Sequence, residues 1–181
     1  MDDFLRGLQM SVVFGQFRTA DLVRVTQLFN KTNQFNTTTR RYTTEEVANF
    51  AAAVEMMTLQ FRLLDKYGDN GIVSAMILHP DPKQPEVFEI DNWVMSCRVF
   101  GRQLEFEAMN IAAEQARCRG IKALRATYIP TPKNGVISEL YPSLGFCPVD
   151  GTPENGGACW FLDLAKPITR STHISRSEQA K

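Results

Sequence analysis

The sequence MSCRVFGRQ at residues 95–103 joins a predicted strand to a predicted helix and carries two arginines. A loop that leads into a helix N-terminus directs unbonded backbone N–H groups toward one point, which suits an anion. Arg98 and Arg102 can add charge-assisted hydrogen bonds to phosphate. The alternative is an ordinary connection with solvated arginines. The candidate anion-binding residues are Arg98, Val99, Phe100, Gly101, Arg102 and Gln103.

Three side chains near this loop are candidates for covalent or proton-transfer chemistry. Cys97 lies beside an arginine and near a helix N-terminus, two features that favour a thiolate. A buried thiol at a strand end is the simpler interpretation. Glu89 and Asp91 are two residues apart on a predicted strand, so they share a face. They either act in proton transfer and substrate binding or form a solvent-facing or ion-paired couple.

A stretch rich in Thr and Asn, residues 31–42, contains two adjacent arginines that suit an acidic ligand. Arg40 and Arg41 could bind the phosphate of a carrier-protein arm or a small acidic substrate, or they could be solvated in an ordinary loop. Trp93 is either a core residue or a stacking platform. The candidate substrate-binding residues are Asn36, Arg40, Arg41, Glu89 and Trp93.

The composition excludes several classes of function. Twenty Lys and Arg balance twenty Asp and Glu in 181 residues, which argues against nucleic-acid binding by bulk charge. The apolar runs are too short to span a membrane. The acidic start carries no secretory signal, and the four cysteines show no CxxC pairing. We therefore expect a cytoplasmic protein with reduced thiols.

Histidine is nearly absent, and this narrows the chemistry further. His79 precedes a proline, and His173 lies close to the C-terminus, so neither suits a Ser-His or Cys-His pair. Two remote histidines and scattered cysteines give no zinc-ligand spacing, so we expect no metal. The common glycine-rich nucleotide loops are also missing.

The hydrophobic patterns predict the element order β-α-α-β-β-β-α-β-α-β. Thr43 and Glu46 form a predicted capping box before a helix, and Gly120 is placed to end the longest helix. Strands are predicted at residues 11–17, 59–63, 72–78, 87–95, 123–128 and 158–164, with helices from residue 19 and over 43–54, 103–119 and 134–144. An antiparallel meander followed by a βαβ unit predicts an α/β or α+β fold with a central mixed sheet. We expect one domain over residues 1–168 and a polar, disordered tail over 169–181.

Two local patterns resemble the GCN5-related N-acetyltransferase (GNAT) family. The stretch RVFGRQ at residues 98–103 is similar to the loop that holds the coenzyme A pyrophosphate, with Gln103 where the family has a small residue. The stretch NGVISELYPSLGF at residues 134–146 resembles a segment in which an Asn contacts pantetheine and a Tyr can protonate the leaving thiolate. The resemblance implies an acyl-CoA N-acyltransferase fold. It also implies pantetheine binding by Asn134, an acid role for Tyr141 and a base role for Asp91.

A narrower resemblance rests on three longer strings: NKTNQFNTTTRRY at residues 30–42, EIDNWVMSCR at 89–98 and YIPTPKN at 128–134. They resemble the C-terminal GNAT-like part of FkbH-like proteins, the HAD-superfamily IIIC group. That family is associated with loading a glyceryl unit onto an acyl carrier protein on the way to methoxymalonyl-type polyketide extender units. The phosphatase-like HAD half, with its aspartate motif, has no counterpart here. The resemblance therefore implies an acyl carrier protein and a HAD-type phosphatase domain or subunit as partners.

Two classes of function remain open from the sequence. The first is acyl transfer from a pantetheine thioester, carried by coenzyme A or by the phosphopantetheine arm of a carrier protein. Asp91, Tyr141 and Cys97 are its candidate catalytic residues. The second is a non-catalytic docking module that binds a carrier protein or a partner HAD subunit, because one fold can host unrelated functions.

Overall fold

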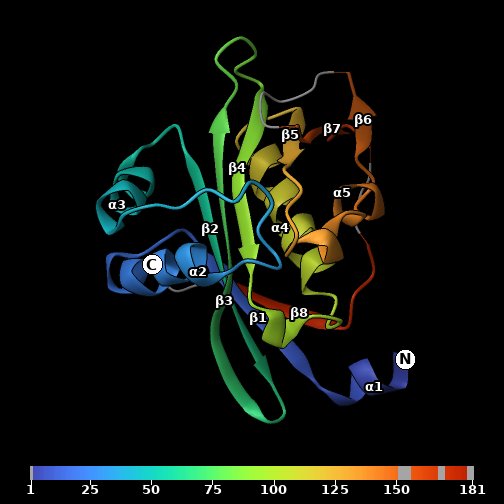
Figure 1. Cartoon of the computed structure of the whole chain (residues 1–181). Helices are drawn as coiled ribbons and strands as arrows, with labels where there is room; N and C mark the ends of the chain where they lie inside the picture. Colours follow the sequence, from blue (N-terminus) through green and yellow to red (C-terminus); the bar gives the residue numbers. More distant parts are fainter. Residues whose placement is uncertain (1, 151–155, 167–169, 179–181) are drawn as a thin grey trace.

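The computed structural model of the chain describes residues 2–150, 156–166 and 170–178. They form one eight-stranded mixed sheet in the order β6-β7-β5-β4-β3-β2-β1-β8, with helices against its faces (Figure 1). The strands are β1 (Met10–Gly15), β2 (Met57–Asp65), β3 (Gly68–Pro80), β4 (Val87–Met95), β5 (Ala123–Tyr128), β6 (Cys147–Val149), β7 (Ala158–Asp163) and β8 (Ile174–Glu178). The α-helices are α1 (Asp2–Gly7), α2 (Leu22–Lys31), α3 (Thr44–Ala52), α4 (Leu104–Cys118) and α5 (Leu140–Ser143). Three 3-10 turns complete the elements: η1 (Thr19–Asp21), η2 (Cys97–Val99) and η3 (Gly135–Ile137).

The topology follows the predicted order. Strands β1 to β4 are an antiparallel meander, and α4 carries the chain from β4 to its parallel neighbour β5. The predicted mixed sheet flanked by helices is confirmed, and the bounds of β4 and β5 match the prediction. The single helix predicted over residues 134–144 is instead η3 followed by α5, and α1 and β6 were not predicted.

Two apolar clusters pack on the sheet, and each follows from sequence periodicity. On one side, Val25 and Phe29 of α2 and Val47 of α3 are buried against β3 and β4. On the other side, the small residues of α4 lie against the sheet and form part of the larger core. The α3 capping box is present, because the Glu46 backbone N–H donates to Thr43 Oγ1 and the Glu46 carboxylate accepts from the Thr43 backbone N–H.

A β-bulge on β4 determines which side chains face which cluster. Ile90 is opposite Leu78 and Asn92 is opposite Ile77, so Asp91 is an extra residue without a partner on β3. Ile90 and Trp93 therefore both point into the larger core although they are three residues apart. Bulges re-aim side chains in this way and are frequent next to functional sites.

The C-terminal segment differs from the expected disordered tail. Residues 174–178 form β8, which pairs in parallel with β1 at the sheet edge. Arg176 of β8 also pairs with Glu107 and Glu114 of α4. The segment is polar because it is a solvated edge strand, and its stability comes from a partner about 160 residues away along the chain. Among the described helices, none has the length and apolar character required to cross a membrane.

Candidate functional site

The two halves of β4 have different neighbours on the β5 side. Residues 87–90 pair with β5, whereas the second half of β4 is bonded to the connection between α2 and α3 (Figure 1). The Thr37 N–H donates to the Trp93 carbonyl (3.1 Å), and the Met95 N–H donates to the Phe35 carbonyl (3.1 Å). The Ile129 N–H, just after β5, donates to the Thr37 carbonyl (2.8 Å). Residues 35–38, called the 35–38 segment below, thus fill the space between the diverging strands.

Asn134 holds the 35–38 segment in place. Its Nδ2 donates to the carbonyls of Asn36 (3.1 Å) and Ile129 (2.9 Å), and its Oδ1 accepts from the Thr131 N–H (2.7 Å). The side chain is fully buried. Both ends of the amide are therefore used within the chain, and Asn134 has a structural role in this conformation.

Asn36 is fully bonded as well. Its Oδ1 accepts from the Thr39 N–H (2.9 Å), and its Nδ2 donates to the Thr32 carbonyl (3.2 Å). The residue is fully buried, and it forms part of the wall of a small pocket of about 200 Å³ together with Thr39 and Thr131. The two asparagines together make the segment a well-bonded part of the fold.

Tyr141 lies beneath the same segment. It is 1% exposed and packs against Phe146, with ring centroids 5.0 Å apart. Its hydroxyl has no hydrogen-bond partner of acceptable geometry among the described residues. Burial raises the pKa of Tyr141, and the nearby Thr37 hydroxyl offsets part of that rise. An unpartnered buried hydroxyl is unusual and requires an explanation.

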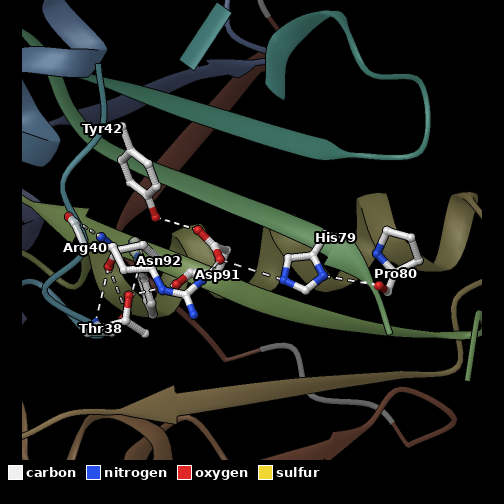
Figure 2. Close-up of polar contacts among 9 residues, drawn as sticks. Thr38, Arg40, Tyr42, His79, Pro80, Asp91 and Asn92 are labelled. Carbon is white, nitrogen blue, oxygen red and sulfur yellow. Dashed lines mark hydrogen bonds and ion pairs between the residues drawn. The ribbon is translucent and has the colours of Figure 1, made fainter. Parts of the chain in front are cut away.

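A polar cluster surrounds Asp91 on the α2 and α3 side of the sheet. Asp91 Oδ2 accepts from the Tyr42 hydroxyl (2.5 Å), and Oδ1 pairs with Arg40. Figure 2 shows Tyr42 and His79 approaching the carboxylate from opposite sides, with His79 Nε2 3.8 Å from Oδ1. The Thr38 hydroxyl donates to the Asp91 carbonyl (2.7 Å). Burial raises the pKa of Tyr42 to about 12, so the phenol remains a neutral donor.

This cluster stabilises the carboxylate rather than leaving it free to take a proton. Both oxygens of Asp91 accept hydrogen bonds, and the residue is 8% exposed. The arrangement ties the chain that follows the 35–38 segment to β4. Arg40 and His79 are its more exposed members, and they would be the first to meet a ligand.

The predicted anion-binding loop has the backbone that such a role requires. Gly101 and Gln103 have left-handed φ angles of 73° and 65°, and Gln103 is the N-cap of α4. Among the described residues, the N–H groups of Leu104 and Phe106 have no hydrogen-bond partner. The helix N-terminus is therefore open. The Gln103 side chain is engaged, because its Oε1 accepts from the His173 N–H (3.3 Å).

The two arginines of the loop point to different places. Arg102 pairs with Asp65 at the end of β2 and is removed from the loop's open side. Arg98 is exposed, and together with the exposed thiol of Cys97 it lines a cleft beside α2. Val99 is buried in the core. The sequence presents the two arginines as equivalent, but the fold brings only Arg98 to a cleft.

Two clefts lie on either side of the 35–38 segment. The first, called the basic cleft, has a volume of about 890 Å³ and is lined by α2 and the residues that follow it, by the end of β4 with the loop after it, and by the loop after β5. The second, called the α4-side pocket, has a volume of about 260 Å³ and is lined by apolar side chains with Glu105 and Glu139. Phe35 lines the second and Asn33 lines the first, so the chain passes between them.

The remaining substrate-binding candidates are dispersed. Trp93 is fully buried, and its Nε1 donates to Ser74 Oγ (3.0 Å), so it is a core residue in this conformation. Glu89 is half-buried and opposite His79 on β3. Arg41 donates to the carbonyls of Phe29 and Thr32 and so holds the end of α2.

Several residues of the site were not predicted from the sequence. Tyr42 and His79 reach Asp91 from other elements, and Arg24 and Lys133 join Arg98 in the basic cleft. No local pattern indicates these contacts, because each depends on long-range pairing. Within the described part of the chain, no group of His, Cys, Asp or Glu is arranged to hold a metal ion.

Comparisons with known proteins identify the fold. No protein-family model and no curated protein sequence matches the chain. Among solved structures, the ribosomal-protein-S18-alanine N-acetyltransferase from Escherichia coli is 14% identical, with a TM-score of 0.61 over 88% of this chain and 96% of that chain. A GNAT-family acetyltransferase from Streptococcus pneumoniae is 17% identical, with a TM-score of 0.64 over 84% and 99%.

A third similar structure, from Salmonella typhimurium, is assigned as an acetyltransferase and was solved with its cofactor acetyl-CoA. It is 15% identical, with a TM-score of 0.64 over 89% of this chain and 98% of that one. These likenesses agree with the single mixed sheet flanked by helices. The chain therefore has the GNAT acetyltransferase fold.

Proposed function

We propose that this chain is an acyl-transfer domain that takes a pantetheine thioester along the second half of β4. The observation that carries the proposal is the unpartnered, fully buried hydroxyl of Tyr141 beneath the 35–38 segment. A buried hydroxyl without a partner costs about 1–3 kcal/mol, so a ligand that accepts its hydrogen bond gains a prepared site. Tyr141 lies beside Thr37 of the 35–38 segment, so a ligand that replaced this segment would meet the Tyr141 hydroxyl.

The backbone of β4 suits an extended amide-containing arm. The Trp93 carbonyl and the Met95 N–H are one acceptor and one donor on the same strand edge, and the 35–38 segment occupies both in this conformation. A peptide-like arm can bind such an edge as an added strand. We propose that the segment withdraws and that the arm takes over these two hydrogen bonds.

The thioester supplies an activated acyl group when it is bound. The Tyr141 phenol carries its proton at neutral pH, as tyrosine ordinarily does, and burial raises its pKa further, so the hydroxyl holds a proton that can pass to the departing sulfur as negative charge develops on it. The attacking nucleophile loses a proton in the same reaction, and this proton restores the phenol directly or through water. Asp91 holds Arg40 and Tyr42 near the site and is a positioning residue in this proposal.

The finer assignment rests on the FkbH-like strings. They support a carrier-protein arm or coenzyme A as the thioester carrier, a HAD-type phosphatase as a partner, and a glyceryl or methoxymalonyl-type unit in polyketide biosynthesis. The strings at residues 30–42 and 128–134 contain the 35–38 segment and Asn134. The resemblance is thus concentrated on the residues that fill the gap between β4 and β5.

One observation favours the docking-module alternative. The 35–38 segment satisfies its hydrogen bonds with β4, Ile129 and Asn134, and it leaves no room for an arm in this conformation. A permanently closed gap would make the chain a binding module for a carrier protein or a HAD subunit. The two functions differ in one property, which is release of a thiol from an acyl thioester.

The experiment measures thiol release from acyl-pantetheine and acyl-carrier-protein thioesters with the full chain, its Tyr141→Phe variant and a Tyr67→Phe control. Tyr67 is exposed at the β2–β3 turn, so this control removes a hydroxyl far from the gap. We expect Tyr141→Phe to lower turnover about 100-fold or more, because it removes the proton donor. Its melting temperature should not fall, since the lost hydroxyl has no partner.

Equal turnover by the Tyr141→Phe variant and the parent chain would contradict the acid role. A parent chain that binds the carrier protein but releases no thiol would establish the docking module instead.

A further inference from the structure

The basic cleft contains four cations and no carboxylate. Arg24 and Lys31 come from α2, Arg98 from the loop after β4, and Lys133 from the loop after β5. Three elements distant in sequence therefore place like charges around one hollow. The other lining side chains are polar or apolar, and none is Asp or Glu.

Among the described residues, the positive charge of this cleft has no carboxylate partner, whereas several other arginines of the chain do. Arg40, Arg102, Arg125 and Arg176 each pair with an Asp or Glu side chain. Within the described residues, none of the four cleft cations forms such a pair. The whole chain has zero net charge, so the local excess does not reflect a general surplus of Lys and Arg.

Arg24 shows the excess of positive charge in the cleft most clearly. It is half-buried, and one of its Nη atoms donates to the Ile72 carbonyl (3.1 Å), which fixes the guanidinium at the cleft wall. Burial lowers the pKa of Arg24, and the positive charge of Arg98 lowers it further. Two cations held close without an anion repel one another, and an anionic ligand would remove that cost.

We propose that the basic cleft is a binding site for a phosphate group, carried either by a small phosphate ester or by a pantetheine arm. Arginine and lysine side chains converging on one hollow are the usual recognition chemistry for phosphate. The volume of about 890 Å³ leaves room for a body attached to the phosphate. Gln27, Asn33 and Ser96 provide hydrogen-bonding groups for that body.

The site is distinct from the helix N-terminus of α4. Glu105 lies at that terminus and lines the α4-side pocket, where its carboxylate would repel a phosphate. The basic cleft lies on the other side of the 35–38 segment, and Arg98 is the loop arginine that reaches it. The inference holds whether or not the chain performs acyl transfer.

Calorimetry of the full chain at low salt tests the proposal with inorganic phosphate, glycerol 3-phosphate and 4′-phosphopantetheine, and with phosphate-free pantetheine. We expect the phosphate-bearing probes to bind and pantetheine to bind at least about tenfold more weakly. The tighter of the two esters identifies the source of the phosphate. Arg98→Gln should weaken phosphate binding about tenfold or more, whereas Lys83→Gln, an exposed charge outside the cleft, should leave it unchanged.

Cysteine alkylation locates the bound probe. Cys97 lines the cleft, whereas Cys118 and Cys147 are exposed elsewhere. We expect the tighter phosphate ester to slow alkylation of Cys97 while the other two cysteines react at their original rates. Absence of binding by all phosphate probes, equal binding of pantetheine, or unchanged alkylation of Cys97 at saturation would each overturn the proposal.

Discussion

The basic cleft and the α4-side pocket share the same loop after β4 but have opposite character. Four cations line the first, whereas Phe35, Phe100 and Leu140 line the second together with two glutamates. Residues 32–34 line the first and Phe35 lines the second, so the chain that enters the 35–38 segment borders both. In our proposals, this difference would orient a ligand that has a charged end and an apolar end, with its phosphate in the basic cleft and its acyl part toward the α4-side pocket.

The proposed function therefore depends most on the 35–38 segment, called the partition below. It is anchored at one side by Asn134, which bonds to Asn36. At the other side, Thr38 and Tyr42 are anchored to Asp91. The hydrogen bonds at each side can be removed by a separate substitution, and we expect the resulting losses of stability to differ in size.

The largest effect is expected from Asn134→Leu. The substitution removes the hydrogen bonds to Asn36, Ile129 and Thr131, and it leaves one buried and two part-buried backbone groups without these partners. We expect the free energy of unfolding to fall by about 3 kcal/mol, measured by chemical denaturation. Asn70→Leu, near the start of β3, removes a single part-buried hydrogen bond to Asp65; it is the control and should cost about 1 kcal/mol. If Asn134→Leu lowers the free energy of unfolding no more than the control does, the hydrogen bonds of Asn134 do not stabilise the partition.

The second effect is a loss of stability at alkaline pH. The folded-state pKa of Tyr42 is about 12 against an ordinary value of 10, so folding favours the protonated phenol. This contribution is complete below pH 10 and disappears as the pH rises from about 10 to 12, with a maximum of about 2–3 kcal/mol. The burial of Tyr141 acts in the same direction.

Denaturation midpoints measured from neutral to alkaline pH test this expectation. The parent chain should lose stability above pH 10, and Tyr42→Phe should lose less over the same interval. Tyr67→Phe serves as the control and should follow the parent chain. Parallel curves for the parent and Tyr42→Phe would show that ionisation of Tyr42 does not contribute to the loss of stability at alkaline pH.

The smallest effect concerns the charge of the α4-side pocket. Burial raises the pKa of Glu105, so the ionised carboxylate is less favourable in the folded chain than in the unfolded chain. Glu105→Gln should therefore stabilise the chain at pH 7 by less than about 1 kcal/mol and leave it unchanged at acidic pH, where the parent carboxyl is protonated. Destabilisation at pH 7 would mean that the Glu105 carboxylate stabilises the N-terminus of α4. The negative charge of the α4-side pocket would then serve the stability of the fold rather than the binding of a ligand.

Local sequence patterns predicted most of the fold. The bounds of β4 and β5 follow from apolar runs, and the start of α3 follows from the Thr43 and Glu46 capping box. The polar strand β8 could not be predicted in this way, because its stability depends on pairing with β1. The GNAT fold, expected from two short patterns, is confirmed by the solved structures.

The candidate site was predictable only in part. Arg98 and Asp91 were identified from their neighbours in sequence, and both occupy polar clusters. The filling of the gap between β4 and β5 has no local signal, since the 35–38 segment bonds to Trp93 and Ile129 far along the chain. The β4 bulge, which places Asp91 and Trp93 on different faces, is likewise a property of pairing with β3.

The most direct test of the proposed function is amide hydrogen exchange, resolved by residue, with and without a non-hydrolysable acyl-pantetheine analogue. In the free chain, the Thr37 N–H is protected by the Trp93 carbonyl and the Met95 N–H by the Phe35 carbonyl. If the arm replaces the segment, Thr37 should lose protection at saturation while Met95 keeps it. Unchanged protection of Thr37 at saturating analogue would contradict the proposal that a thioester arm occupies this edge of β4.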